Sequence, residues 1–416
     1  MWLCAQLGAR EHYAIPRSLH KAGQLGAVYT DFWAGASLRH LAATFGTRTL
    51  RSMATRFHPA LAQVPVAAWN LRSLEWEIIL RRGAQKGDAG RYASFIKVGR
   101  RFACAVREHV RRRADLSEAT CFFSYDTGAL EVLEFLSERG VCCVLGQMDT
   151  NRVEVNLVRE EEKRWPGWQQ YPTEVPEEYF RRREQEWLLA DRVVVNSDFS
   201  RRALIQQGVP PEKLVVVPLC YEETKNNKEH EAFSSKSIPD VGRPLRVLWL
   251  GQVILRKGIQ YLLQAARLLE QEYIRFDVVG PIGISGDAVA SAPRNVVFHG
   301  PVSRDQVGPW YLRSDVFVLP TLSDGFAITQ LEAMAHGLPV ITTLNCGQVV
   351  TDGIDGFIVP AGDAASLAAA LQRYLLETTL LRDHNAAALR KAQQFTLDHV
   401  AEKLLKLEAN FESVRF

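Results

Sequence analysis

The sequence predicts an α/β protein built from two doubly wound domains with parallel sheets. Short apolar runs alternate with amphipathic helical patterns along most of the 416 residues, which is typical of strands joined by right-handed helical crossovers. The alternation occurs twice, once on each side of a polar stretch at 222–244 that reads as a linker. We therefore expect two Rossmann-like domains that face each other across a cleft, with ligands at the carboxyl ends of the strands.

In the first half, strands are expected at six apolar runs, residues 2–7, 27–30, 119–124, 142–147, 192–196 and 214–217. Helical patterns lie between them, as at 13–22, 129–139, 176–190 and 200–207. The stretch 50–113 is rich in arginine and apolar residues and looks helical throughout. We interpret it as a helical insertion in the first domain.

The second half repeats the alternation, with strands expected at 246–250, 276–279, 296–299, 316–319, 339–342 and 357–359. Helices are expected at 260–270, 304–313, 328–335 and 364–376. We place an N-terminal domain at 1–238 and a C-terminal domain at 239–395. A final helix at 396–416 could pack back on the N-terminal domain.

Composition excludes several classes of protein. No run of eighteen uncharged apolar residues occurs, and the first residues read as a strand and not as a signal peptide. The seven cysteines are odd in number and form no C-x-x-C pair, which favours buried thiols in a reducing cytoplasm. The histidines are scattered and no metal-binding motif occurs, so we expect neither a metal nor another cofactor.

The basic residues are unevenly distributed. The net charge of the chain is only +3, yet residues 81–113 contain eleven Lys and Arg and two acids. Apolar residues, among them Phe95, Ile96, Phe102 and Val106, lie between these cations. Such a surface would suit a peripheral contact with an anionic bilayer or a lipid-diphosphate acceptor. The alternative is a solvated helical face, and a nucleic-acid partner is not expected because only one segment is basic.

One loop carries the most informative pattern. The donor loop, as we name residues 320–327, lies between an expected strand and an expected helix, where free backbone N–H groups can bind a diphosphate. Gly325 would let a ligand approach the main chain closely. Asp324 could accept hydrogen bonds from sugar hydroxyls, and Glu332, two helical turns further on, could hold a ribose diol. The alternatives are a helix N-cap for Asp324 and a solvated carboxylate for Glu332.

This stretch resembles the donor loop of the retaining glycosyltransferases of family 4, which have the two-domain GT-B fold. Their signature, E-G-F-G-x-x-x-x-E, is matched by Gly325, Phe326 and Glu332. Asp324 replaces the first glutamate, and Ala327 replaces the last glycine of the loop. The first carboxylate is therefore one methylene shorter than the family usually has.

A second element, at 247–263, reads as the strand, loop and helix that open the C-terminal domain. It resembles the family's G-R-x-x-x-x-K-G pattern, in which two cations hold the donor diphosphate. Gly251 and Lys257 match, Gln252 replaces the arginine, and Arg256 could restore the second charge. Two cations would stabilise the charge that builds on a leaving diphosphate. An ordinary surface Arg-Lys pair is the alternative.

Further stretches agree with the resemblance, which extends over roughly residues 184–370. Residues 296–302, which end at Val302, resemble the strand and turn whose main chain reads the nucleotide base. Residues 190–197, 208–214 and 352–359 resemble the closing elements of the two domains.

The resemblance implies that the N-terminal domain holds the acceptor and that its first loop closes over the diphosphate. In that loop, Gly8 and Arg10 could reach the donor phosphates and His12 the acceptor. The alternative for His12 is a helix-start residue. Asp126 stands where many relatives have a histidine and could bond the acceptor or the donor sugar, unless it only caps the helix at 129–139. Asp149 is a similar case.

The implied function is the retaining, metal-independent transfer of a sugar from a nucleotide-diphosphate donor to a glycan, a glycolipid or another hydroxyl acceptor. In this hypothesis Lys257 and Arg256 stabilise the leaving diphosphate, and Asp324 orients the donor sugar. Two alternatives stay open. One is an enzyme of the same fold that epimerises or phosphorolyses a sugar nucleotide. The other is a catalytically weak homologue that acts as a sugar- or nucleotide-binding subunit, which the changes at Asp324 and Gln252 and the missing histidine at the place of Asp126 favour slightly. Neither the donor sugar, the base, the acceptor nor the linkage can be read from the sequence.

Overall fold

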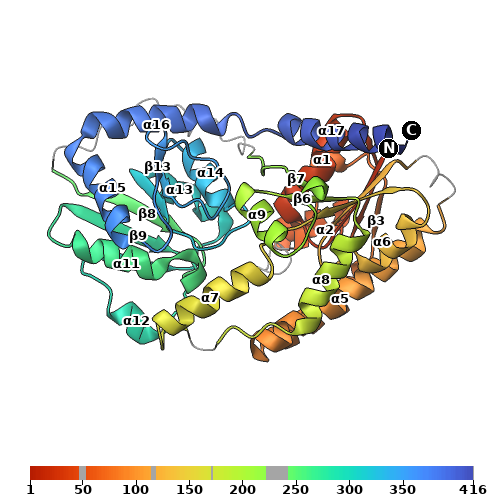
Figure 1. Cartoon of the computed structure of the whole chain (residues 1–416), viewed down its shortest axis with the longest axis horizontal. Helices are drawn as coiled ribbons and strands as arrows, with labels where there is room; N and C mark the ends of the chain where they lie inside the picture. Colours follow the sequence, from red (N-terminus) through yellow and green to blue (C-terminus); the bar gives the residue numbers. More distant parts are fainter. Residues whose placement is uncertain (46–52, 114–118, 170–171, 222–241, 416) are drawn as a thin grey trace.

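The computed structural model describes residues 1–45, 53–113, 119–169, 172–221 and 242–415, and it contains two α/β domains (Figure 1). Each domain is built on one sheet in which all the strand pairs are parallel, as the sequence predicts. The strand order is β3-β2-β1-β4-β5-β6-β7 in the N-terminal domain and β10-β9-β8-β11-β12-β13 in the C-terminal domain. In both sheets the order reverses beside the first strand, which is the doubly wound arrangement.

The N-terminal sheet consists of β1 (Trp2–Gln6), β2 (Leu25–Thr30), β3 (Val66–Ala68), β4 (Cys121–Tyr125), β5 (Cys142–Gly146), β6 (Arg192–Val195) and β7 (Leu214–Val216). Six of these strands confirm the predicted ones. The prediction of helix throughout 50–113 is wrong at β3, which pairs with β2 at the sheet edge. Three residues are too few to show an alternating pattern, so only the hydrogen bonds to β2 define this strand. Residues 50–52 of that stretch lie outside the described residues.

The helices of the N-terminal domain are α1 (Ala14–Lys21), α2 (Ala36–Phe45), α4 (Asn70–Ala84), α5 (Gly87–Val110), α6 (Leu130–Ser137), α7 (Arg152–Arg164), α8 (Glu177–Leu189) and α9 (Asp198–Gln206). Short 3-10 turns occur at η1 (Arg10–Tyr13), η2 (Pro59–Leu61) and η4 (Pro211–Lys213). α4 and α5 form an antiparallel hairpin, and α5 packs on the sheet through the buried residues Phe102 and Val106.

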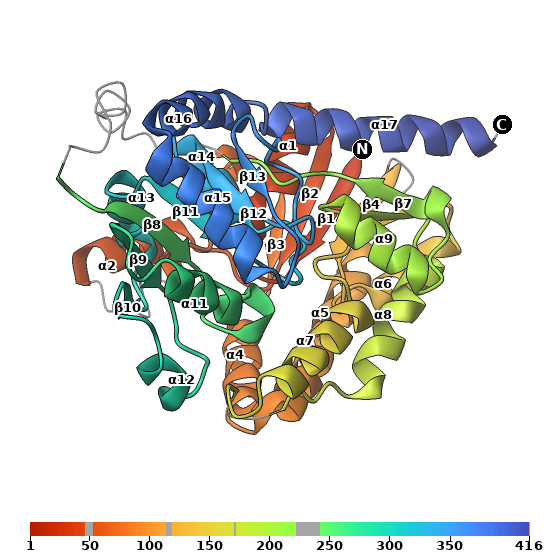
Figure 2. The same cartoon turned by 60° about the vertical axis from the view of Figure 1, so that its left-hand side comes forward.

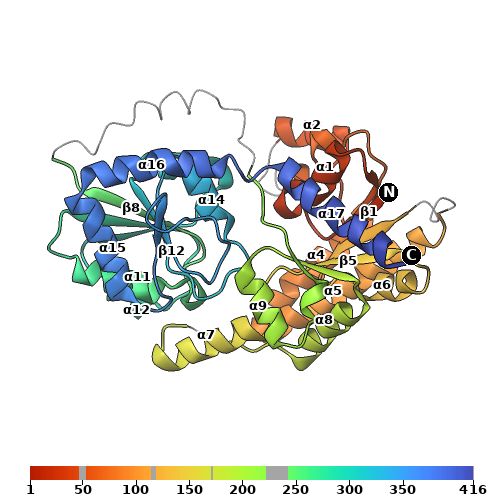
Figure 3. The same ribbon diagram turned by 45° about the horizontal axis from the view of Figure 1, so that its top comes forward.

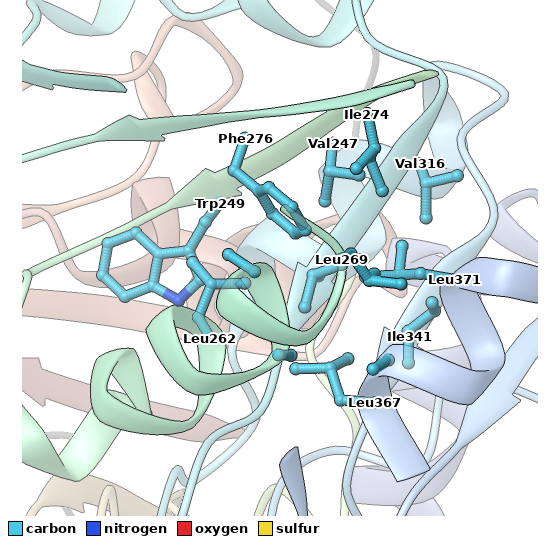
Figure 4. Packing of buried hydrophobic residues seen from close by; sticks show 14 of the residues in the cluster. Val247, Trp249, Leu262, Leu269, Ile274, Phe276, Val316, Ile341, Leu367 and Leu371 are labelled. Carbon is cyan, nitrogen blue, oxygen red and sulfur yellow. The ribbon is translucent and has the colours of Figure 1, made fainter. Parts of the chain in front are cut away.

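The C-terminal sheet consists of β8 (Leu245–Leu250), β9 (Ile274–Val279), β10 (Val296–Gly300), β11 (Val316–Leu319), β12 (Val340–Thr342) and β13 (Gly356–Ile358). Its helices are η5 (Leu255–Lys257), α11 (Ile259–Leu268), α12 (Gly286–Ala290), η6 (Arg304–Gln306), α13 (Gly308–Leu312), α14 (Ile328–Ala335), α15 (Ala364–Leu376) and α16 (Thr378–Ala392). The helix expected at 304–313 is divided into η6 and α13, because Pro309 has no N–H to continue the ladder. One face of this sheet packs Trp249 and Phe276 against Leu262 of α11 and Leu371 of α15 (Figure 4).

The last helix, α17 (Leu397–Arg415), returns to the N-terminal domain, whereas α16 lies on the C-terminal domain (Figures 1 and 3). Val400, Leu404 and Leu407 belong to the same buried cluster as Trp2, and the Trp2 indole donates a 2.7 Å hydrogen bond to Glu408. The chain thus crosses between the domains twice. The linker predicted at 222–244 lies outside the described residues except for its last three positions. Among the helices that the structure describes, none has the length and apolar character needed to cross a bilayer.

Candidate functional site

The cations of η5 lie directly against the donor loop. Leu322 donates a 2.9 Å backbone hydrogen bond to the carbonyl of Arg256, and the Lys257 ammonium forms an ion pair with the Asp324 carboxylate. Gly258, which has a φ of 76°, lies so close to the donor loop that a Cβ atom there would overlap the Pro320 carbonyl. The two elements recognised separately in the sequence therefore form a single site.

This proximity fixes the charge of Asp324. Burial raises the pKa of the Asp324 carboxyl, but Lys257 and Arg256 lower it by more, so the pKa stays below its usual value. Asp324 is therefore an anion at neutral pH, able to accept hydrogen bonds from hydroxyl groups. The side chain is not a helix N-cap, because α14 has no side-chain cap and begins after Ala327.

Ala327 has an unusual backbone conformation for a residue with a side chain. Its φ and ψ are 61° and 76°, in the left-handed region, at the position where the resembled signature has glycine. A left-handed alanine costs roughly 1–2 kcal/mol relative to the right-handed form. The left-handed conformation of Ala327 therefore costs free energy in the turn that leads to the first amides of α14.

Residues from the N-terminal domain complete the donor loop. The Arg256 guanidinium donates a 2.9 Å hydrogen bond to the carbonyl of Ser323 and lies 3.4 Å from Glu154 of α7. The Ser323 hydroxyl donates to the same Glu154 carboxylate over 3.0 Å and lies 3.1 Å from the Thr150 hydroxyl. Burial lowers the pKa of Arg256, but Glu154 and Asp324 raise it above its usual value, so the guanidinium is held charged.

α7 also braces the two domains further along its length. The Glu161 carboxylate accepts hydrogen bonds of 2.9 Å from Gln260 and 2.7 Å from Tyr261, both at the start of α11. Figures 1 and 3 show α7 extending from the N-terminal domain along the C-terminal one. One helix of the N-terminal domain thus contacts both the donor loop and the helix that follows Lys257.

Glu332, predicted to hold a ribose, is fixed by neighbouring side chains. Its carboxylate accepts a 3.0 Å hydrogen bond from the Tyr311 hydroxyl and lies 3.7 Å from the Arg304 guanidinium. The ring of Tyr311 stacks on His336. Glu332 is therefore held in place by its neighbours and is not merely a solvated carboxylate.

The remaining residues predicted to bind the donor are Val302, Phe326, Gly251 and Gln252. Val302 and Phe326 pack in the same apolar cluster, which joins the turn after β10 to the donor loop. Gly251 has a φ of 158°, close to extended, and donates a 3.0 Å backbone hydrogen bond to Val279. Within the described ranges, the Gln252 side chain makes no hydrogen bond, so it does not substitute for an arginine by pairing with the loop.

The first loop of the N-terminal domain is strained. Glu11, His12 and Tyr13 follow one another with φ values of 50°, 51° and 62°. Three successive left-handed residues with side chains are uncommon, and such strain persists only where surrounding contacts impose it. One such contact is the 3.2 Å hydrogen bond that the Arg17 guanidinium donates to the carbonyl of His12. Earlier in the loop, the Gly8 amide donates a 2.8 Å hydrogen bond to Asp31.

The candidate residues of this loop lie between the two domains. The Arg10 guanidinium lies over the ring of Tyr125, 5.2 Å from its centroid. Burial lowers the pKa of His12, as do the positive charges of Arg304, in the C-terminal domain, and Arg17. His12 also stands at a helix start, because it lies in η1, which leads directly into α1 at Ala14, although its side chain does not cap α1.

Asp126 belongs to a buried charge cluster. The Arg183 guanidinium bonds Asp126, donates a 2.7 Å hydrogen bond to Asp149 and donates a 2.9 Å one to Asn151. Asp126 is 3% exposed, and its Oδ1 atom has no hydrogen-bond partner among the described residues. Burial raises the pKa of Asp126 although Arg183 opposes this.

The alternative that Asp126 caps the helix after β4 is wrong. The cap comes from Glu186 of α8, whose carboxylate accepts hydrogen bonds from the amides of Thr127, Ala129 and Leu130 over 2.7, 3.0 and 3.0 Å. A carboxylate about sixty residues further along the chain carries no local sequence signal, so the sequence offers only Asp126 as a candidate cap.

The segment 81–113 forms the end of α4, all of α5 and the residues that follow. Ile96, Phe102 and Val106 are buried in the N-terminal domain, and of the four named apolar residues only Phe95 is exposed, at 37%. These apolar side chains therefore belong mostly to the hydrophobic core of the N-terminal domain. Among the described side chains, no group of three His, Cys, Asp or Glu residues is arranged to hold a metal ion.

Two parallel-sheet Rossmann-like domains, with a donor loop at the edge of the second, define the GT-B class of fold. Residues 244–377 match the family model described as Glycosyl transferases group 1. The amylovoran biosynthesis glycosyltransferase AmsK of Erwinia amylovora is 28% identical over 185 residues, which are 41% of this chain and 44% of that protein. The chain spans about half the length of the curated relatives it matches.

Solved structures of the same fold align over nearly the full chain. Sucrose-phosphate synthase from Thermosynechococcus elongatus covers 100% of both chains with a TM-score of 0.60 and 17% identity. HepE of Anabaena, solved in complex with UDP and glucose, covers 98% of this chain and 99% of its own, with a TM-score of 0.56 and 15% identity. At these identities the likeness establishes the fold.

Proposed function

We propose that this protein is a retaining glycosyltransferase that moves a sugar from a nucleotide-diphosphate donor to a hydroxyl acceptor. The observation that carries the proposal is the joint position of Arg256, Lys257 and Asp324 at the donor loop. Two cations and a carboxylate at one helix N-terminus match the charges of a diphosphate linked to a sugar. The match of residues 244–377 to a glycosyltransferase family supports the same assignment.

In the proposed reaction, the acceptor oxygen forms a bond to the anomeric carbon as the bond to the diphosphate oxygen breaks on the same face. The acceptor proton passes to the leaving phosphate oxygen, so no further base is needed. Lys257 and Arg256 stabilise the charge that grows on the diphosphate, together with the amides of Phe326 and Ala327. In the protein without a donor, Lys257 pairs with Asp324. A diphosphate that binds would also contact the Lys257 ammonium. The Asp324 carboxylate could then accept hydrogen bonds from sugar hydroxyls.

Glu332 is assigned to the ribose of the nucleotide, and the main chain near Val302 to its base. The hydrogen bond from Tyr311 leaves acceptor capacity on the Glu332 carboxylate for two ribose hydroxyls. UDP is a donor nucleotide worth testing first, since HepE was solved with UDP and glucose. Two cations at the diphosphate supply the charge that a divalent metal would otherwise provide, and we propose that the reaction needs no metal.

The acceptor is assigned to the N-terminal domain, where His12 and the Asp126–Arg183–Asp149 cluster lie, whereas Gly8 and Arg10 are assigned to the donor phosphates. A glycan or a lipid-linked saccharide is the proposed acceptor class, and the relationship to an amylovoran biosynthesis enzyme supports this class. Asp149, with a side chain 32% exposed, is better placed than Asp126 to meet a substrate. The seven unpaired cysteines agree with a cytoplasmic location.

A screen of nucleotide sugars by thermal shift tests the donor site, since a ligand that binds the native state raises the apparent melting temperature. The donor that stabilises the protein is then incubated with candidate acceptors while nucleoside diphosphate release is measured. Release that requires an acceptor supports transfer. Epimerised or phosphorolysed donor identifies the alternative enzyme, and stabilisation without any turnover identifies a binding subunit.

A further inference from the structure

The donor loop lies beside a second loop, residues 343–347, which we name the bracing loop. The two loops follow the paired parallel strands β11 and β12, so both leave the sheet at the same edge. Figure 2 shows these strands next to each other, with α14 beside them. Four hydrogen bonds join the loops, from the Thr343 hydroxyl to the carbonyl of Thr321 (2.7 Å), from the Asn345 side chain to the carbonyl of Leu322 (2.9 Å), from the Asp324 amide to the carbonyl of Asn345 (2.9 Å) and from the Gly347 amide to the carbonyl of Phe326 (3.1 Å). The bracing loop therefore contacts the donor loop along most of its length.

Gln330, in the first turn of α14, ties the two loops together. Its side chain is fully buried, and its amide nitrogen donates hydrogen bonds of 2.6 Å to the carbonyl of Phe326 and 2.9 Å to the carbonyl of Gly347. The Phe326 ring lies against Gly347 so closely that a Cβ atom on Gly347 would overlap it. Gln330 thus joins the end of the donor loop to the bracing loop, from a position that the resembled E-G-F-G-x-x-x-x-E signature leaves open.

The hydrogen bond from Gln330 to Phe326 fixes the direction of the next amide. The Phe326 carbonyl and the Ala327 N–H belong to one planar trans peptide, so they point in opposite directions. A carbonyl held towards Gln330 therefore directs the Ala327 N–H away from this side chain. Burial raises the pKa of Asp324, whereas Lys257 and, to a smaller extent, the Ala327 amide lower it. The Ala327 amide is thus directed towards the carboxylate of the donor loop.

Asn345 acts in a similar way on an earlier peptide of the donor loop. Its carbonyl accepts the hydrogen bond from the Asp324 amide, and the carbonyl of the same peptide, that of Ser323, accepts a 2.9 Å hydrogen bond from Arg256. The peptide that leads into Asp324 is therefore held at both ends. The Asn345 side chain adds its hydrogen bond to the carbonyl of Leu322, one peptide earlier.

We propose that Gln330 and Asn345 are positioning residues for the donor. Gln330 is too deeply buried to touch a ligand, so it acts through the Ala327 amide, whereas Asn345 acts through the backbone that carries Asp324. The inference rests on the proposed function, in which the donor-loop amides meet the diphosphate and Asp324 meets the sugar. A brace of this kind also supplies the surrounding contacts that a left-handed residue such as Ala327 needs.

Amide hydrogen exchange of the full chain, without any ligand, tests whether these side chains hold the donor loop. Gln330→Met keeps a long unbranched side chain but removes both donated hydrogen bonds, and Asn345→Ala removes the hydrogen bond to Leu322. We expect the protected amides of residues 320–331 to exchange about fivefold faster or more in each variant, because the loss of a hydrogen bond makes local opening easier.

Asn295→Leu is the matched control. Asn295 donates, like Gln330, to two backbone carbonyls, but these belong to Ala266 and Leu269 at the end of α11. This variant should have a lower melting temperature, and its donor loop should exchange at the rate of the unchanged protein. Donor-loop exchange that stays the same in Gln330→Met, or that rises equally in Asn295→Leu, overturns the proposal.

Calorimetric titration with UDP, well below the melting temperature of each variant, separates positioning from stability. We expect the Kd for UDP to rise about fivefold or more in Gln330→Met, because its loop amides are no longer held in the binding geometry. The Kd should stay the same in Asn295→Leu. Faster exchange with an unchanged Kd would give Gln330 a structural role alone and overturns the proposal. If none of UDP, GDP and ADP binds the unchanged protein, the proposed function fails instead, and the exchange comparison decides by itself whether Gln330 holds the donor loop.

Discussion

Gly325 of the donor loop and Met148, just after β5, approach so closely that a Cβ atom on Gly325 would overlap the Met148 carbonyl oxygen. The two residues belong to different domains, so this contact sets how near the donor loop lies to the N-terminal domain. The sequence predicts Gly325 as a position for close ligand approach. The structure adds a second reason for glycine there, which is the neighbouring backbone.

Gly325→Ala should therefore loosen the contact between the domains. An added methyl group in a closely packed site costs typically about 1–3 kcal/mol, here borne by the carbonyl of Met148 and the donor loop. We expect a lower melting temperature and a higher KM for the donor. Gly286→Ala is the control, since an added Cβ there has no neighbour within 4 Å. Equal behaviour of the two variants would contradict the role of this contact.

Ala327 offers a test of backbone strain in the donor loop. Ala327→Gly removes the cost of the left-handed conformation, which stabilises the protein. The change also raises the entropy of the unfolded chain and removes a buried methyl group, and both effects destabilise it. The free energy of unfolding should therefore change by less than about 1 kcal/mol. Ala327→Val should destabilise by about 2 kcal/mol or more, because a β-branched residue tolerates this conformation poorly. Denaturant unfolding measures both. A valine variant as stable as the glycine variant would show that Ala327 is not strained.

Glu154 is predicted to be a positioning residue for Arg256. Glu154→Gln keeps the shape of the side chain but removes the charge that faces the guanidinium, and we expect kcat/KM for the donor to fall about tenfold through KM. Glu160→Gln, on the exposed side of the same helix, is the control. If the Glu154→Gln variant is less stable but keeps its KM for the donor, Glu154 only stabilises the contact between the domains and does not position Arg256.

Glu11 should make stability fall as the pH rises. Burial raises the pKa of Glu11 from 4.5 to about 7, although Arg10 opposes the shift. Between these two values the folded protein holds a proton that the unfolded chain has released, so raising the pH favours unfolding. Glu11→Gln should remove this part of the slope between about pH 4.5 and about pH 7. Denaturant titrations at both ends of this pH interval measure how the free energy of unfolding changes with pH. An equal pH dependence for the unchanged protein and the Glu11→Gln variant would contradict the raised pKa of Glu11.

Most of the fold could be predicted because each buried strand of a parallel sheet is a short apolar run. β3 could not, since Val66–Ala68 has neither the length nor the alternation of a strand and depends on its pairing with β2. The proximity of Arg256, Lys257 and Asp324 could also be predicted, because these residues occur in short motifs with fixed spacing. The structure brings these residues together as the spacing implies.

The contribution of the N-terminal domain to the donor loop could not be predicted. Glu154 and Ser323 are separated by 169 positions, and their hydrogen bond depends on how the two domains dock. Arg183, which joins Asp126 to Asp149, likewise lies on a helix whose pattern only shows that it is amphipathic. Local periodicity specifies elements, whereas such contacts arise from their assembly.

The central claim is that Lys257 stabilises a departing diphosphate, and turnover of Lys257→Ala tests it most directly. With the donor found by thermal shift, kcat/KM should fall by about a hundredfold or more, because the cation acts on charge that develops in the transition state. Lys163→Ala, exposed on α7, should keep full activity. Near-normal turnover by a correctly folded Lys257→Ala protein would contradict the account.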